Sequence, residues 1–140
     1  MIQQTATSTK NIFPFLRYRD APAAIEWLAG AFGFEKQMVV PGPDATIAHA
    51  QMRFGSGVIM LGSARGNRPA SSRPREIEAV EQGIYIFVED VDAHYRRAKA
   101  AGAEIVRELE NTDYGSREYS ACDLEGFYWS FGTYQPNGSE

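Results

Sequence analysis

The chain has 140 residues, of which 44% are hydrophobic and 23% charged, as is typical of one folded globular domain. Its formal net charge of −4 argues against general nucleic-acid binding. No apolar run approaches the roughly 18 residues of a membrane span, and the first nine residues carry no secretory pattern. The only cysteine, Cys122, excludes an intrachain disulfide and a multi-cysteine zinc site. Composition therefore predicts a cytoplasmic protein that binds neither nucleic acid nor a membrane.

The first half of the sequence predicts one helix among several strands. A strand is expected over 11–18, and Asp20 followed by Pro22 is typical of a helix start. Gly33 is placed to end that helix in a left-handed conformation. Further strands, the last two joined by a tight glycine-rich turn, are expected at residues 34–40, 47–54 and 58–61.

The second half of the sequence repeats this order after a polar connector at residues 63–82, which we expect to be a solvated loop. Asp90 is expected to begin a second helix and Gly102 to end it. Further strands are expected at residues 83–88, 104–109, 117–122 and 127–131.

Residues that begin or end these elements recur at a nearly constant spacing. The pairs are Asp20 and Asp90, 70 positions apart, and Gly33 with Gly102 and Gly57 with Gly126, each 69 positions apart. This spacing predicts a duplicated βαβββ unit. Each unit is too small to cover its own sheet. We therefore expect modules 11–62 and 83–134 to pair, either within one chain or by swapping between two chains, as one α+β domain over residues 1–140, with a curved mixed sheet and helices on its outer face.

Several segments resemble one known family. Residues 15–25 resemble its opening strand and helix, and residues 114–117 (YGSR) with 123–129 (DLEGFYW) resemble its most specific motif, although Leu124 stands where proline is usual. The sequence is thus similar to the vicinal oxygen chelate superfamily, the group of glyoxalases, bleomycin resistance proteins and dioxygenases, over about residues 11–134. The resemblance implies a glyoxalase/bleomycin-resistance-like fold, a homodimer and a small-molecule ligand.

Enzymes of this superfamily usually hold a divalent metal with His, Gln or Glu, near the start of the first strand and on the last strand of each module. The resemblance places the matching positions at Phe13, Leu61, Gly83 and Ser130. Three of these side chains cannot bind a metal, and serine alone is a poor ligand. A shift by one residue along the strands adds only Gln82. The sequence therefore predicts no metal and no other cofactor.

Alternation along the strands places aromatic and polar side chains on the face opposite the helices. We expect a planar or apolar small molecule to bind there, with a negative group near Arg17. Tyr114 and Arg117 could clamp an anion, or Arg117 could instead bridge the turn through Asp123 or Glu125. The candidate ligand-binding residues are Phe13, Phe15, Arg17, His49, Gln51, Tyr85, Phe87, Tyr114, Arg117, Tyr128 and Ser130.

Other chemically active residues have competing interpretations. His49 and Gln51 could hold a displaced metal together with Glu118, and His49 alone could act as an acid or base, but a hydrogen-bonded strand histidine is the plainer interpretation. His94 is expected at the surface or edge of the second helix. Cys122 needs a neighbouring base to act as a nucleophile and is expected to be an ordinary strand cysteine. Residues expected in the core on the helix side include Met60, Trp129 and Phe131.

Three functions fit these observations. The leading hypothesis is a metal-independent protein that sequesters or senses a small aromatic or hydrophobic compound. The second is a lyase, isomerase or dioxygenase that uses the displaced metal or His49. The third is a dimeric regulatory or scaffold protein, in which the aromatic side chains fill the groove or the dimer contact.

Overall fold

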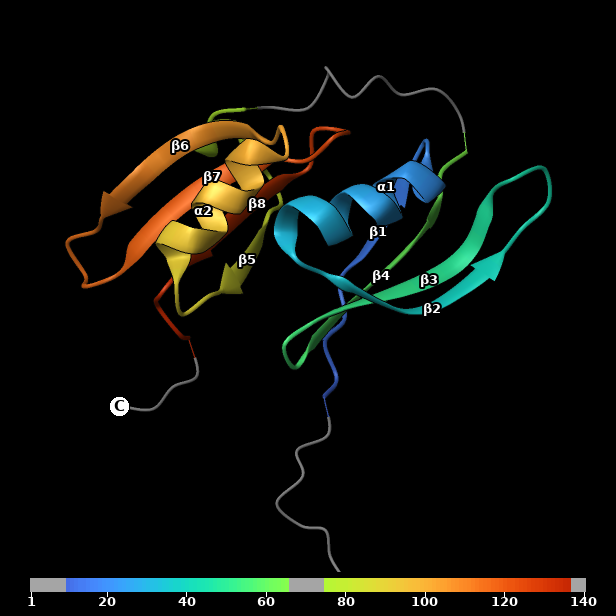
Figure 1. Ribbon diagram of the computed structural model, residues 1–140, viewed down its shortest axis with the longest axis horizontal. Helices are drawn as coiled ribbons and strands as arrows, with labels where there is room; N and C mark the ends of the chain where they lie inside the picture. The colour runs from blue at the N-terminus through green and yellow to red at the C-terminus, as the bar shows by residue number, and fades with distance from the viewer. Residues whose placement is uncertain (1–9, 66–74, 137–140) are drawn as a thin grey trace, which may run out of the picture.

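The computed structural model describes residues 10–65 and 75–136, which form two βαβββ modules (Figure 1). The first module contains β1 (Phe15–Tyr18), α1 (Ala21–Trp27), the π-helix η1 (Leu28–Phe32), β2 (Glu35–Pro41), β3 (Ile47–Phe54) and β4 (Gly57–Ser63). The second contains the 3-10 helix η3 (Ile77–Ala79), β5 (Ile84–Phe87), α2 (Val91–Ala100), β6 (Glu104–Asn111), β7 (Arg117–Cys122) and β8 (Tyr128–Gly132). The predicted α+β class is confirmed.

Each module builds a four-stranded mixed sheet. The strand orders are β1-β4-β3-β2 and β5-β8-β7-β6, with the first strand of each module parallel to the last and the other neighbours antiparallel. β1 begins at Phe15, later than the expected residue 11, because Pro14 has no N–H to donate to a ladder. The carbonyl of Pro14 still accepts from the N–H of Met60 at 2.8 Å.

The capping residues that revealed the repeat act as predicted. The side chains of Asp20 and Asp90 each accept a hydrogen bond from the backbone N–H three residues later, at 3.1 and 3.0 Å. Gly33 and Gly102 follow the two helical segments with φ values of 87° and 94°, a left-handed conformation that favours glycine. The two helices therefore begin and end at equivalent places in the two modules.

The two modules share one hydrophobic core. Figure 1 shows α1 and α2 on the same side of the two sheets, with η1 packed against α2. Phe32 of η1 is fully buried, and its ring centroid lies 5.5 Å from that of Trp129 and 4.8 Å from that of Phe131. Arg97 of α2 donates to two carbonyls of η1 at 3.0 and 3.1 Å. The first module thus supplies core residues to the second sheet.

A second contact joins the β7–β8 turn to the junction of β1 and α1. Tyr18, at the end of β1, donates its hydroxyl proton to the buried carboxylate of Asp123 at 2.5 Å. The Glu125 carboxylate accepts the successive backbone N–H groups of Arg19 and Asp20 at 2.7 and 2.8 Å. Two buried carboxylates of the second module therefore hold the start of the helix in the first.

The repeats differ in length at their second hairpin turn. Phe54 pairs with Gly57 across a turn made of two residues, Gly55 and Ser56. In the second module the Asp123 N–H donates to the carbonyl of Phe127, so three residues lie between those partners. The β7–β8 turn is therefore one residue longer.

Because of this extra residue, Met60 does not lie on the helix side, where it was predicted. The parallel strand pairs set Met60 beside Phe15 and Ser130 beside Tyr85, so Met60, not Leu61, is the counterpart of Ser130. A shift of one residue reverses the face on which a strand side chain lies. Met60 therefore lies on the face away from α1, and Leu61 is buried on the other. Trp129 and Phe131 are fully buried on the helix side, as predicted.

Part of the predicted connector at 63–82 falls on residues 66–74, outside the described residues. In the ranges that are described, no helix has both the length and the apolar character needed to cross a membrane.

Candidate functional site

The open face of the first sheet carries a hollow of about 230 Å³ between β1, β3 and β4. Phe15 lines it and leaves 65% of its surface exposed. The guanidinium carbon of Arg17 lies 5.6 Å from the centroid of the Phe15 ring, within the range of a cation–π contact. His49 and Met60 line the same hollow. This hollow, which we call the first-sheet site, therefore combines an aromatic ring, a cation and an imidazole.

A larger hollow of about 740 Å³ adjoins the first-sheet site and shares Arg17 with it. Its lining includes the turn between β2 and β3 and Arg65 at the end of the first module. Arg17 and Arg65 therefore line the two adjoining hollows, and Asp44 is the one carboxylate among the described residues that line the larger one. A ligand that carries an acidic group would find two cations there.

The open face of the second sheet is occupied by its own polar side chains. Glu118 is 5% exposed and accepts hydrogen bonds from Arg107 at 3.1 Å and from the Tyr114 hydroxyl at 2.9 Å. Arg107 also donates to Ser120 at 3.1 Å, and Ser120 shares a hydrogen bond with Ser130 at 2.7 Å. The buried charge of Glu118 is therefore balanced by groups of its own sheet.

Gly132 makes this arrangement possible. A Cβ at this position would lie 2.5 Å from Cγ of Glu118 and 2.8 Å from the hydroxyl oxygen of Tyr85. The Tyr85 hydroxyl donates to the carbonyl of Tyr134 at 2.6 Å. Burial, followed by the nearby charge of Glu118, raises the pKa of Tyr85. The side chains of Tyr85 and Glu118 therefore pack over Gly132, in space that any other residue at this position of β8 would fill.

The predicted ligand-binding residues form separate groups within one chain. Phe15, Arg17 and His49 meet at the first-sheet site, while Gln51 pairs with Met60 on the same sheet face and Phe13 precedes β1. The residues that lie instead on the second sheet or beside it are Tyr85, Phe87, Tyr114, Tyr128 and Ser130.

Arg117 forms its side-chain hydrogen bonds, among the described residues, with groups other than Asp123 and Glu125, the partners predicted for it in the β7–β8 turn. Its guanidinium donates to both carboxylate oxygens of Asp92, at 2.8 and 3.3 Å, and to Asn111 at 3.2 Å. The hydrogen bond from Arg117 lowers the pKa of Asp92. Alternation along β7 places Arg117 on the helix side and Glu118 on the open side. Arg117 therefore attaches β7 to the first turn of α2.

His94, expected at the surface or edge of the second helix, is half-buried and contacts the first module. Its Nε2 lies 2.8 Å from the Phe32 carbonyl, which can only accept, so Nε2 carries the proton and Nδ1 accepts from the Tyr119 hydroxyl at 2.7 Å. Burial lowers the pKa of His94, with a further lowering by the charge of Arg97. The histidine is thus a neutral link between the two modules.

Acidification is expected to weaken the fold through His94. Because the folded-state pKa lies below the unfolded value, the unfolded chain binds more protons, and stability falls as pH drops through about 6.5. Urea unfolding between pH 7.5 and pH 5 should show this loss, and H94Q should show a smaller one. The exposed-face variant H49Q serves as the control. Equal pH dependence in H94Q and the wild type would contradict the assignment.

Cys122 is fully buried, and burial raises its pKa to about 11. The thiol is therefore protonated at neutral pH and is a poor nucleophile. It pairs with Tyr128, which is also buried. The expectation of an ordinary strand cysteine agrees with this placement.

The displaced metal set of His49, Gln51 and Glu118 is not assembled within one chain. His49 and Gln51 lie on β3, whereas Glu118 lies on β7 and binds Arg107 and Tyr114. Among residues 10–65 and 75–136, no three His, Cys, Asp or Glu side chains gather closely enough to hold a metal ion.

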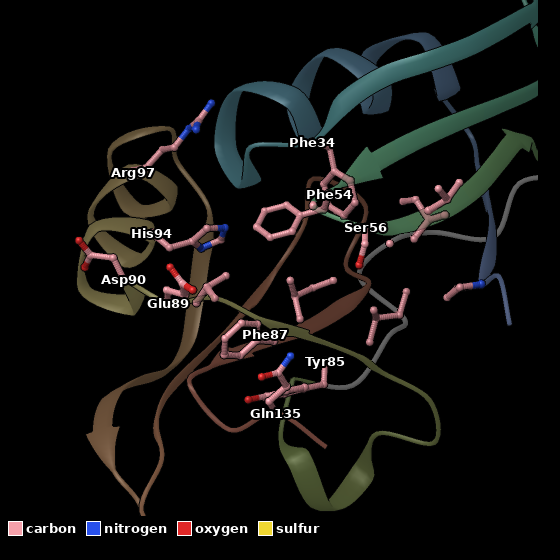
Figure 2. Close-up of a pocket in the computed structure, with 18 of the residues that line it drawn as sticks. Phe34, Phe54, Ser56, Tyr85, Phe87, Glu89, Asp90, His94, Arg97 and Gln135 are labelled. Carbon is pink, nitrogen blue, oxygen red and sulfur yellow. The ribbon is translucent and has the colours of Figure 1, made fainter. Parts of the chain in front are cut away.

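A third cavity, of about 740 Å³, lies between the modules (Figure 2). The β3–β4 turn, β5 and the start of α2 line it, and its aromatic members include Phe34, Phe54 and Phe87. We call it the inter-module pocket. Sequence reasoning placed Phe87 on the open sheet face and did not predict this cavity. The tight turn at Gly55 and Ser56, which lines the cavity, could be recognised in the sequence, but the cavity itself could not.

Comparisons with known proteins agree with this architecture. The sequence model of the Glyoxalase/Bleomycin resistance protein/Dioxygenase superfamily matches residues 6–131. An uncharacterized protein of Mycobacterium tuberculosis, Rv0887c, is 34% identical over 138 residues, which covers 93% of this chain and 80% of the relative.

Two solved structures show the same fold. TioX from Micromonospora sp. ML1 is 29% identical with a TM-score of 0.71, and the match covers 93% of this chain and 100% of TioX. The fosfomycin resistance protein FosX from Listeria monocytogenes is 13% identical with a TM-score of 0.70, covering 93% and 97%. The chain therefore belongs to the Glyoxalase/Bleomycin resistance protein/Dioxygenase superfamily.

Proposed function

We propose that this protein binds a small aromatic or apolar molecule with an acidic group at the first-sheet site, without a resident metal. The observation that carries the proposal is the exposed ring of Phe15, 65% accessible, with the Arg17 guanidinium 5.6 Å from its centroid. An aromatic ligand can stack on the ring while its acidic group pairs with the guanidinium. Protein binding sites typically combine such apolar surface with a few polar anchors.

The residues at the positions where the family binds metal do not fit a divalent ion. Phe13 and Met60 on the first module, and Gly83 on the second, offer no side-chain ligand, and Ser130 is engaged by Ser120. Glu118 could supply one carboxylate oxygen, but it already accepts from Arg107 and Tyr114. A metal-independent binder is therefore favoured over the lyase, isomerase or dioxygenase alternative.

We also propose that two copies associate through the open sheet faces. Phe13 and Phe15 are 40% and 65% exposed, and Met38 and Val40 of β2 are 47% and 42% exposed. Clusters of exposed apolar side chains on one face commonly mark an interface. A second copy would shelter the first-sheet site from water and add side chains to it.

The proposal predicts that 2-naphthoate, an aromatic carboxylate, binds the wild-type protein. F15A is expected to weaken binding about tenfold, since an aromatic contact contributes roughly 0.5–1.5 kcal/mol beyond burial and about 1.4 kcal/mol is tenfold. R17Q should also weaken binding, because it removes the cation that pairs with the ligand carboxylate. The loss of affinity relative to the wild type should be larger at the lower salt concentration, where charges are screened less. The affinity is measured by fluorescence titration at two salt concentrations.

Y134A, an exposed aromatic change on the other module, is the matched control and should leave the affinity unchanged. Elemental analysis of untagged protein should find near-zero Mn, Fe, Co, Ni, Cu and Zn, and none of these ions should raise Tm. Metal near one equivalent per chain would overturn the metal-independent proposal. Equal affinities of wild type, F15A and R17Q would overturn the site.

A further inference from the structure

The open faces of the two sheets carry different charges over one equivalent position. Gly62 of β4 pairs with Arg17 of β1, and Gly132 of β8 pairs with Phe87 of β5, so the two glycines correspond. A Cβ at Gly132 would lie 2.5 Å from Cγ of Glu118. A Cβ at Gly62 would lie 3.2 Å from a guanidinium nitrogen of Arg17. The second module therefore places an acidic side chain over its glycine, and the first module places a cation there.

The two charged groups differ in whether the chain supplies a counter-charge. Glu118 is buried and accepts hydrogen bonds from Arg107 and Tyr114. Arg17 is exposed, and its guanidinium lies near the ring of Phe15. Among the residues that the structure describes, no carboxylate forms an ion pair with Arg17. An acid that binds at the first-sheet site therefore meets a guanidinium that these residues do not neutralise.

The larger hollow of about 740 Å³ beside the first-sheet site contains a second such cation, Arg65. In the described part of the chain, no ion pair joins Arg65 to a carboxylate either. Arg65 follows Gly62 by three residues, so their Cα atoms are at most about 11 Å apart. The N–H of Ile47 donates to Ser63 Oγ at 2.8 Å, which holds the end of β4 beside the start of β3 (Figure 1). A ligand that pairs with Arg17 therefore needs only a short extension to reach Arg65.

Asp44 is the negatively charged residue of the larger hollow, and the turn that contains it explains its presence. Asp44 and Ala45 have φ values of 57° and 62°, and the N–H of Thr46 donates to the carbonyl of Pro43 at 3.1 Å. Positive φ at both central residues is typical of a tight hairpin turn, in which aspartate is one of the favoured residues. The backbone of this turn therefore accounts for Asp44 without a role in binding.

The charge of Asp44 opposes a second acid less than Arg65 favours it. No ion pair joins Asp44 to Arg65 within the described ranges, so an acid in contact with the guanidinium does not have to touch the carboxylate. Interactions between charges in water weaken with distance and are screened by salt. A direct contact with Arg65 therefore outweighs the repulsion from a carboxylate that lies further away.

We propose that the first-sheet site and the larger hollow form one site for an aromatic molecule with two acidic groups, a ligand class that rests on the proposed function and narrows it. The ring lies on Phe15, the first acid pairs with Arg17, and the second acid pairs with Arg65. The ligand thereby brings to the first module a carboxylate of the kind that Glu118 supplies in the second.

The test compares two probes of equal size, N-(2-naphthoyl)aspartate and N-(2-naphthoyl)asparagine, which differ in whether the second group is a carboxylate or a neutral amide. Calorimetric titration of the wild type at low salt should find the aspartate conjugate bound about fivefold more tightly, the upper range for an exposed ion pair. R65Q should reduce this preference below about twofold and leave the affinity for the asparagine conjugate unchanged. High salt should reduce the preference of the wild type.

Two further variants test the charges separately. D44N should increase the preference for the aspartate conjugate, because it removes the opposing charge while asparagine still tolerates the left-handed backbone. R96Q removes an exposed arginine from α2 of the other module and is the matched control, which should keep the wild-type preference. A reduced preference in D44N would overturn the proposal, because it would show that the second group of the ligand is attracted to Asp44.

Equal affinities of the wild type for the two conjugates, or an equal preference in the wild type and R65Q, would also overturn the two-acid proposal. The proposed function would survive that result if the asparagine conjugate binds and F15A weakens its binding. Failure of both conjugates to bind the wild type would overturn the two-acid ligand and the first-sheet site together. The comparison of the two conjugates on the wild type does not depend on the folding of any variant.

Discussion

Replacing Phe32 by alanine is expected to lower the free energy of unfolding by roughly 3–5 kcal/mol, the range for truncating a buried aromatic residue. The ring is fully buried and lies 4.9 Å from Trp27, 5.5 Å from Trp129 and 4.8 Å from Phe131, measured between centroids. It therefore fills space that belongs to both modules. Urea unfolding followed by far-UV circular dichroism measures the loss.

The control for this prediction is Y134A, which removes an aromatic ring from an exposed position outside the first-sheet site and the proposed dimer face. Its free energy of unfolding should lie within about 0.5 kcal/mol of the wild type, as for most surface changes. Because the core is shared, F32A should still unfold in one transition, at a lower urea concentration. A loss below about 1 kcal/mol in F32A would show that the contact between η1 and α2 contributes little to stability.

Replacing Asp123 by alanine is expected to cost roughly 3–5 kcal/mol, because several buried donors lose their acceptor and each unsatisfied donor costs about 1–3 kcal/mol. The carboxylate accepts hydrogen bonds from the Tyr18 hydroxyl at 2.5 Å and the Trp129 indole at 3.0 Å. It also accepts the backbone N–H groups of Glu125 and Phe127 at 2.9 and 3.0 Å. Alanine would leave buried donors from both modules without this acceptor. Chemical denaturation at neutral pH measures the effect.

Two further variants sharpen the Asp123 experiment. Y18F removes a single donor and should cost about 0.5–3 kcal/mol, since the carboxylate retains its other partners. D113A removes a carboxylate from an exposed turn and should change stability by less than about 0.5 kcal/mol. Similar losses in D113A and D123A would indicate a general effect of charge and would contradict the role of the buried network.

The features predicted correctly from sequence depend on local chemistry. Asp20 and Asp90 cap their helices because a carboxylate satisfies N–H groups only three residues away, and Gly33 and Gly102 tolerate a left-handed backbone. The same residues recur at a nearly constant spacing, which is how the duplication could be recognised. The fold could therefore be predicted from helix caps and turn residues that act over a few positions and occur in both modules.

The features that sequence reasoning missed depend on pairs of residues far apart in the chain. His94 pairs with the carbonyl of Phe32, and Tyr18 pairs with Asp123, across 62 and 105 positions. No local pattern distinguishes a histidine that faces another module from one that faces water. Met60 was misplaced for a different reason, because one added residue in a turn reverses every later side chain of a strand.

The π-helix η1 explains why the spacing of the repeat changes from 70 to 69 within the first helix. The interval from Asp20 to Gly33 holds one residue more than that from Asp90 to Gly102, and a π turn is an α turn widened by one residue. The two copies have thus diverged in length by an insertion in this helix and another in the β7–β8 turn. Both insertions lie where the modules meet, and neither disturbs a parallel strand pair. Divergence after duplication therefore changed the contacts between the two modules, while each module kept its strand order.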